Sequence, residues 1–381
     1  MSIRTTYGIY INARIHARRS ELLTKPRYEE MLQCTDTAGL ARNLLANPFY
    51  EKDMAEALLH GDGANAVEEA AGRNLDREFE LLTRLVRREP LRAEAMMYFL
   101  HRWDLAAVKS LMRRGIRGES AGRFGLVTGP SLPWPVMERY AAQAGTLEAT
   151  VQMLAGQFPS LCGRLPRLLA SRNEEQHGAE AVAMLETALD RRYFERCGDF
   201  MWTGPRLAPV REYLRLEVDR INLRSVLADL LYGANTAESR GPWLRGGLVD
   251  AAMLDMFAAS GSLEQATVLL ENTSYRALHQ VFTRVQQTGQ LGALDRRFEM
   301  FFVERLGKMV HQDPFGLSLF MNYVWLKWLE CANLRVLARG VEAGLPSGRV
   351  REELICLTLW RWRAARWRCR WPWRGCAWSS P

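Results

Sequence analysis

The stretch DRINLRSVLADLL, residues 219–231, decides the fold class because its apolar side chains follow a helical period. They recur at i, i+3, i+4, i+7 and i+8, the spacing of one face of an α-helix: Leu223, Val226, Leu227, Leu230 and Leu231. Asn222 and Arg224 fall on the two flanks of that face. Polar groups in that position suit a bond to an adjacent helix, so we predict a packed helix that is fastened at its flanks.

The same polar pair recurs in other segments with an apolar stripe, as an Asn followed two residues later by an Arg. It occurs as Asn12 with Arg14 and as Asn333 with Arg335. The segment HRWDLAAVKSLM departs from the pattern, since Asp104 stands at the Asn position and Ala106 stands where Arg is expected. We name these segments the Asn-x-Arg helices.

A second recurring piece is Leu-Asp-Arg followed two residues later by an aromatic residue. It appears as Leu75-Asp76-Arg77 with Phe79, as Leu189-Asp190-Arg191 with Tyr193, and as Leu294-Asp295-Arg296 with Phe298. The three Asp residues lie 114 and 105 residues apart, far above the repeat length of solenoid proteins. This spacing predicts three domain-sized copies in one chain.

Short helix pairs precede these pieces and carry capping signals. Residues 136–161 align with residues 253–278, and in both a Gly is followed by Ser or Thr and by Leu-Glu. Gly suits the end of a helix, whereas Thr146 and Ser262 suit the start of the next one. Residues 27–50 are a weaker copy, in which Thr35, Asp36 and Thr37 supply the caps.

Together these patterns predict an all-α fold with three similar helical domains in a pseudo-threefold arrangement. The predicted domains are residues 1–116, 117–238 and 239–356, followed by an Arg- and Trp-rich tail at 357–381. We expect each Asn-x-Arg helix to be the last long helix of its copy, locked to the Leu-Asp-Arg helix before it. The helix around Asn12 has no such partner before it and is expected to meet the C-terminal segment.

At this point the chain resembles a known family. In order, YGIYINARIHARRSELL, DRINLRSVLADLLYG and ECANLRVLARGVEAGLP resemble the C subunit of V/A-type ATPases and its eukaryotic relative, the vacuolar-pump d subunit of the AC39 family. The resemblance covers roughly residues 5–355. It implies a funnel-shaped, non-catalytic central-stalk subunit at the cytoplasmic face of the membrane. Its implied partners are the rotating shaft and the membrane rotor ring of a complex that links ATP to proton or sodium transport.

Composition and motifs argue against several other classes. Without the tail, 45 basic residues face 43 acidic ones, so a nucleic-acid surface has little support. The seven Cys include no CxxC, and the chain has no HExxH, GxxxxGK[ST] or GxSxG motif. We therefore predict no catalytic, cofactor or metal site and no small-molecule substrate. The start has no apolar signal segment, which favours a cytosolic chain that meets membranes only through partners.

Two questions stay open at this stage. Asp76, Asp190 and Asp295 fit either surface acids paired with Arg or locks between helices, and the Asn-x-Arg pairs fit either packing or partner contact. A helical adaptor outside a rotary motor is the alternative function. An adaptor solenoid would carry more and shorter repeats along an elongated groove. Three long copies instead favour a closed body with an open cavity, as a rotor subunit that receives a shaft needs.

The tail generates the first prediction. Residues 357–381 hold six Arg, six Trp and no acid, and Pro372 interrupts any helical stripe. This composition is typical of GC-rich DNA read out of frame, so we expect an alternative frame near codon 356 to encode an ordinary helical ending of mixed charge. Translating the gene in all three frames checks this. If neither other frame gives such an ending, a disordered native tail or a membrane-surface anchor becomes the better interpretation.

Overall fold

The computed structural model describes residues 3–88, 92–117, 127–171, 178–198, 207–232, 243–271, 273–289 and 291–355. In these ranges the chain forms helices and no β-strand, apart from an isolated bridge between Gly129 and Leu132. The predicted all-α fold class is therefore confirmed. The predicted tail lies outside the described residues. Among the described helices, none has the length and apolar character of a membrane span.

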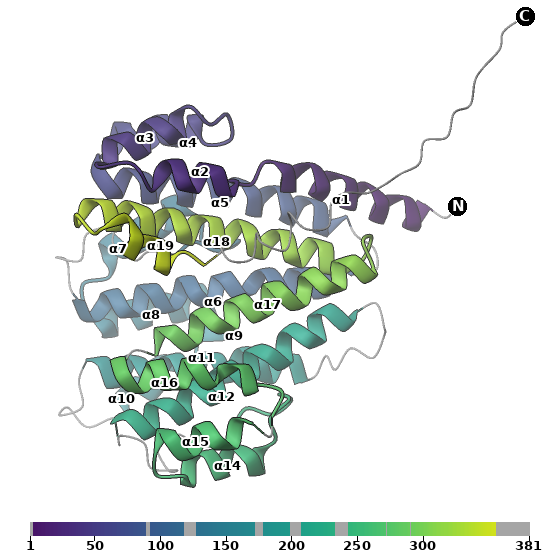
Figure 1. The fold of residues 1–381 in the computed structure, drawn as a ribbon, viewed down its shortest axis with the longest axis vertical. Helices are drawn as coiled ribbons and strands as arrows, with labels where there is room; N and C mark the ends of the chain where they lie inside the picture. The colour runs from purple at the N-terminus through teal and green to yellow at the C-terminus, as the bar shows by residue number, and fades with distance from the viewer. Residues whose placement is uncertain are drawn as a thin grey trace, which may run out of the picture.

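Long helices run side by side across the body, and shorter ones lie at its periphery (Figure 1). In chain order the elements are α1 (Ile3–Ser20), α2 (Lys25–Met31), α3 (Thr37–Leu45), α4 (Glu51–His60), α5 (Gly63–Arg87), α6 (Ala93–Arg117), α7 (Trp134–Gln143), α8 (Leu147–Gln157), α9 (Pro159–Cys162), α10 (Leu165–Ala170), α11 (Ala179–Gly198), α12 (Ala208–Tyr232), α14 (Ala251–Ala259), α15 (Leu263–Leu270), η3 (Arg276–Leu278), α16 (His279–Thr288), α17 (Gly292–Gln312), α18 (Leu317–Glu342) and α19 (Ser347–Glu353).

The predicted caps form at the starts of the short helices. Thr146 accepts the Ala149 N–H at 3.2 Å, and Ser262 accepts the Gln265 N–H at 3.3 Å. In the weaker copy the capping residue is Asp36, which accepts the Gly39 N–H at 2.6 Å. The capping side chains can be predicted from the sequence because they act on the backbone only three residues away.

Each long Asn-x-Arg helix packs against a Leu-Asp-Arg helix: α6 against α11, α12 against α17, and α18 against α5. We name three groups from this packing. The first group is α1–α5 with α18 and α19, the middle group is α6–α11, and the third group is α12–α17. The domain boundaries at 116 and 238, the threefold arrangement and the funnel shape stay predictions.

The proposed order of locking is wrong for the pair in α12. Arg224 bonds Asp295 of α17, which is the Leu-Asp-Arg helix after α12 and not the one before it. The reason is the order of packing: α6 and α12 pack against the Leu-Asp-Arg helices that follow them, α11 and α17, whereas α18 packs against α5 near the start of the chain. The links from α5 to α6, from α11 to α12 and from α17 to α18 therefore run from one group to the next.

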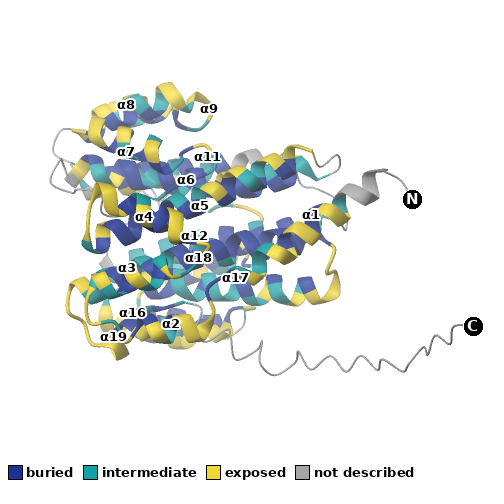
Figure 2. Ribbon diagram, turned by 90° about the horizontal axis from the view of Figure 1, so that it is seen from above, coloured by how far each residue is buried: buried dark blue, intermediate teal, exposed yellow. Residues whose placement is uncertain are grey.

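Two large apolar cores hold the body together, and Figure 2 shows their buried residues along the inner faces of the long helices. One core joins the first and third groups, and the other fills the middle group. Helix α6 contributes to both, with Phe99 and Trp103 in the first core and Val108 and Leu111 in the second. The middle group is therefore attached to the rest largely along α6.

Two buried carboxylates fasten the short helices to the long ones in the same way. Asp219 of α12 accepts the Leu248 N–H at 2.7 Å, the Val249 N–H at 3.1 Å and the Tyr275 hydroxyl at 2.7 Å. Both backbone donors lie just before α14, and Tyr275 lies just before η3. The carboxylate thus fixes the entry to two successive short elements.

Glu330 of α18 does the same in the first group. It accepts the Leu23 N–H, just before α2, at 2.5 Å and the Tyr50 hydroxyl, just before α4, at 2.6 Å. In the alignment of residues 136–161 with 253–278, Phe158 takes the tyrosine position of the middle group. The middle group therefore lacks the hydroxyl that the other two groups use.

This comparison predicts the effect of removing the hydroxyl. Tyr50→Phe and Tyr275→Phe should each lower the free energy of unfolding by about 1–3 kcal/mol, because a buried carboxylate loses a donor. Urea denaturation followed by circular dichroism measures this. Tyr140→Phe, at a half-buried tyrosine of α7, is the matched control. Equal stability of all three variants would show that these bonds carry no net energy.

Candidate functional site

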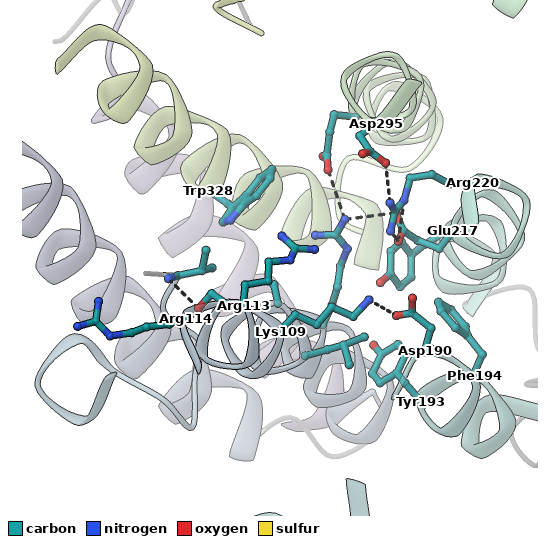
Figure 3. Close-up of a pocket in the computed structure, with 17 residues that line it drawn as sticks. Lys109, Arg113, Arg114, Asp190, Tyr193, Phe194, Glu217, Arg220, Asp295 and Trp328 are labelled. Atoms are coloured by element: carbon teal, nitrogen blue, oxygen red, sulfur yellow. Dashed lines mark hydrogen bonds and ion pairs between the residues drawn. The ribbon is translucent and has the colours of Figure 1, made fainter. Parts of the chain in front are cut away.

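A cavity of about 400 Å³ lies where the middle and third groups face α18 (Figure 3). Five long helices supply most of its lining: Arg102, Leu105, Ala106, Lys109, Ser110, Arg113 and Arg114 from α6, Asp190, Tyr193 and Phe194 from α11, Tyr213, Glu217 and Arg220 from α12, Asp295 and Glu299 from α17, and Trp328 from α18. The lining mixes charged and aromatic side chains.

The cavity has an open end and a closed end. Along α6, the Arg113 side chain is 57% exposed, whereas that of Arg102 is only 10% exposed. On α17, Asp295 is 33% exposed and Glu299, one turn later, is 11% exposed. The mouth therefore lies where α6 ends and α17 begins.

Arg102 forms the floor of the cavity. Its Nη2 lies 3.3 Å from Glu217 Oε1 and 3.3 Å from Glu299 Oε1, which belong to α12 and α17. Its guanidinium lies 4.1 Å from the ring centre of Trp325 in α18. One buried side chain of α6 thus contacts three other long helices.

The two acids beside Arg102 differ in charge state. Burial works to raise the pKa of Glu217, but Arg102 and Arg220 outweigh it and hold the pKa at about 2. Burial raises the pKa of Glu299 to about 7, despite the attraction of Arg102. Near neutral pH Glu217 is therefore ionised, whereas Glu299 is divided between its protonated and ionised forms.

Arg220 joins α12 to α17 beside the floor (Figure 3). Arg224, one turn further along α12, makes a second link to α17. Arg220 lies between Glu217, at 3.0 Å, and Asp295, at 2.9 Å. Arg224 bonds the other Asp295 oxygen. The sequence allowed Asp295 to be either a surface acid or a lock between helices, and these two bonds fit the lock between α12 and α17.

Asp190 has the equivalent role in the middle group. Its carboxylate bonds Lys109 of α6 at 2.5 Å, and one turn further along α6 Arg113 makes a bidentate pair with Glu186. Lys109 stands one turn after Ala106, where the sequence pattern lacks its Arg. The cation is therefore present but displaced, and Ala106 leaves space in the cavity wall.

Asp76 belongs to α5, lies outside the cavity lining and faces the start of α7. It accepts the N–H of Trp134, the first residue of α7, at 2.5 Å. Burial raises its pKa to about 7, while this bond and the nearby charges of Arg73 and Arg335 oppose the shift. Asp76 therefore links the first group to the middle one, and Arg335 acts on it electrostatically.

The Asn positions fasten each long helix to the segment after it. Asn222 exchanges two bonds with the backbone of Leu244, at 2.9 and 3.0 Å, and Asn333 accepts the Ile355 N–H at 3.0 Å. Asp104 accepts the Ser131 N–H at 2.7 Å. These are local packing contacts, so the structure places none of the three in the cavity.

The two residues of the N-terminal pair, Asn12 and Arg14, differ in burial. Asn12 is buried and donates to the carbonyl of Phe315 at 2.5 Å, which holds α1 against the start of α18. Arg14 is exposed. Of the ten residues named from the sequence pattern, the cavity lining includes Asp190 and Asp295.

The sequence patterns do not predict the floor itself. These patterns do not identify Arg102, Glu217 or Arg220, because charged residues on a helix usually lie on its solvent-exposed face. A usable signal does exist. Arg102 and Trp103 lie in a run of large apolar residues, where a charge is costly unless it is paired.

Across the described parts of the chain, no three His, Cys, Asp or Glu side chains gather in a way that would hold a metal ion. The acids and bases of the cavity pair with one another across helices, as structural locks do.

The floor yields a stability prediction. Arg102→Met keeps the apolar stem but leaves Glu217 buried beside fewer cations, so it should cost about 3–5 kcal/mol of unfolding free energy. Arg113→Met, at the exposed mouth, should cost no more than about 1 kcal/mol. Denaturant titration of both variants tests this. Similar losses in the two would mean that burial does not set the strength of the network.

The pKa of Glu299 yields a pH prediction. Its value of about 7 lies above the ordinary 4.5, so folding takes up a proton between these pH values. The contribution of Glu299 is fully present below about pH 4 and is lost as the pH rises to about 7. Glu299→Gln should flatten part of this fall, by up to about 3 kcal/mol. Glu304→Gln on the same helix is the control, and an unchanged slope in Glu299→Gln would contradict the assignment.

The chain is similar to known ATP synthase subunits over nearly all of the described length. The ATP synthase (C/AC39) subunit family matches residues 11–353. The C subunit of the V-type ATP synthase of Thermus thermophilus is 29% identical over 347 residues, which cover 91% of this chain and 98% of the relative. The C subunit of the A-type ATP synthase of Methanocaldococcus jannaschii is 25% identical over 354 residues, which cover 91% and 86%. With its helical fold and its matching span, the chain belongs to the ATP synthase (C/AC39) subunit family.

Proposed function

We propose that this chain is the non-catalytic central-stalk subunit that couples the rotating shaft of a V/A-type ATPase to its membrane rotor ring. The observation that carries the proposal is the cavity, which five long helices line and whose more exposed residues lie where α6 ends and α17 begins. A cavity with a mixed polar and apolar lining suits the tip of a protein shaft.

The closed end of the cavity suits the transfer of torque. Its floor combines close aromatic packing with the buried ion pairs of Arg102. The ring centres of Trp325 and Phe302, for example, lie 4.1 Å apart. Close-packed interiors have low compressibility, so a load on the wall passes to the whole body. In this proposal the cavity transmits force and needs no catalytic residues.

In this proposal the mouth receives the shaft and the opposite end rests on the ring. The chain then lies at the cytoplasmic face of the membrane and is held there through the complex. Three similar groups around the cavity, in a funnel-shaped body, would provide the surrounding wall. Domain boundaries near 116 and 238 belong to the same proposal.

Filling the cavity tests the proposal. Ala106→Trp places a large side chain in the wall and should weaken binding of the purified shaft by about tenfold or more, while the melting temperature stays close to that of the wild type. Surface plasmon resonance with immobilised shaft measures this. Val268→Trp, at a 62% exposed position on α15, is the control.

The same preparations test the non-catalytic role. The purified chain should hydrolyse no ATP without its partner subunits. Turnover by the chain alone, or unchanged shaft binding in a folded Ala106→Trp variant, would count against the proposal.

A further inference from the structure

The three junctions between the groups differ in what fills them. The first and third groups share one apolar core, in which α17 packs along α18, and the first and middle groups meet where α5 packs against α6 and α7. The middle and third groups meet at the cavity, and the packing between their described helices is slight. We name this junction the seam: Asp190 and Tyr193 line its middle side, and Arg220 and Asp295 line its third side.

The charges beside the seam are paired within each of its two walls. In the middle wall Lys109 bonds Asp190 at 2.5 Å, which joins α6 to α11. In the third wall Arg220 bonds Asp295 at 2.9 Å, which joins α12 to α17 (Figure 3). Because each pair has both partners in one wall, these pairs stay intact if the two walls separate.

One edge of the middle group is anchored to the rest of the body. Phe99 of α6 packs in the core that the first and third groups share, with its ring centre 5.1 Å from that of Tyr213 and 6.0 Å from that of Trp325. Trp134, the first residue of α7, lies directly against α5, since a methyl group on Gly72 would lie 2.5 Å from its ring. The described helices that pack closely against α11 all belong to the middle group. The anchored edge therefore follows α6 and the start of α7, and α11 lies away from it.

A short apolar strip closes the seam. Val218 and Ile221 of α12, with Leu244 after that helix, pack against the core of the middle group. Val218 is buried, whereas Ile221 and Leu244 are half-buried. Stabilisation by apolar burial is proportional to the area removed from water, so this strip holds the seam less firmly than a whole core holds a group.

The cavity beside the seam is small for a protein shaft. Its volume is about 400 Å³. One turn of an α-helix, roughly 10 Å wide and 5.4 Å long, fills about the same volume. A shaft tip longer than one turn therefore needs more room. Close-packed groups do not stretch, so the additional room has to come from movement at a joint between them.

We propose that the middle group is a movable wall, which swings about its α6 edge and opens the seam between α11 and the pair α12 and α17. The swing breaks the apolar contacts of Val218, Ile221 and Leu244 and leaves the ion pairs of each wall intact. Arg102 lies on the α6 edge, close to the axis, so its bonds at the floor persist. The movement is a property of the chain alone, whereas its use to admit a shaft rests on the proposed function.

Thiol labelling of the full chain tests the movement. Val218→Cys places a thiol in the apolar strip, Val226→Cys places one in the shared core on the same helix, and Val151→Cys places one in the core of the middle group. In native buffer the Val218→Cys thiol should react with iodoacetamide at least about 100-fold faster than the other two, because opening of part of a structure is far more frequent than global unfolding. Peptide mass spectrometry separates these thiols from the seven native Cys.

Shaft binding gives a second measurement. Val218→Ala removes two methyl groups from the apolar strip, so it should raise the open fraction and tighten binding of the purified shaft by about three- to tenfold. Val226→Ala is the matched control, because it makes the same change on the same helix but in the shared core. Its shaft affinity should stay within about twofold of the wild type.

The outcomes separate the movable wall from the proposed function. Fast labelling of Val218→Cys with slow labelling of the other two variants supports the wall. Equal labelling of Val218→Cys and Val226→Cys overturns it. Equally fast labelling of Val151→Cys also overturns it, because the middle group then unfolds and does not move as a body.

The binding arm decides how the seam is used. Tighter shaft binding by Val218→Ala supports entry of the shaft through the seam, and unchanged affinity overturns that entry. A folded wild-type chain that does not bind the shaft defeats the proposed function. The labelling result, which needs no partner, then still decides whether the wall moves.

Discussion

The arrangement of the long helices depends on one buried cation, the guanidinium of Arg102. A guanidinium cannot lose its proton at any pH a folded protein meets, so burial forces the fold to supply partners. Glu217, Glu299 and the face of Trp325 do so from three different helices. Each of these helices must therefore keep its rotation and height relative to α6. An apolar residue at the same place would tolerate sliding, because dispersion contacts have no preferred direction.

The three groups solve one packing problem with different chemistry. In the third group Asp295 meets Arg224, and in the middle group Asp190 meets Lys109, one turn away from the expected position. In the first group Asp76 bonds the start of α7, and Arg335 acts only through its charge. What recurs is an acid on one helix that faces a donor from another. The repeat therefore preserves electrostatic complementarity more closely than residue identity.

Much of this fold can be predicted from sequence because helices are local. The period around Leu223 and the caps at Thr146 and Ser262 act within a few residues, and the structure confirms all three. Periodicity shows which face of a helix is buried but not which helix covers it. For that reason the sequence predicts the wrong partner helix for Arg224. The floor at Glu217 escapes prediction for the same reason, since its pairing depends on a side chain 115 residues away.

The position of the cavity follows from how the apolar surface is divided. The first and third groups share one core, whereas the middle group has its own, and α6 crosses from one to the other. Had the cores merged, apolar side chains would have closed the space between them, because interiors pack to high density. Arg220, Asp295, Lys109 and Asp190 occupy that boundary instead. A charged group beside water or a polar partner costs less free energy than the same group buried in a dry apolar core. The ion pairs between helices and the hollow are thus two consequences of the same boundary.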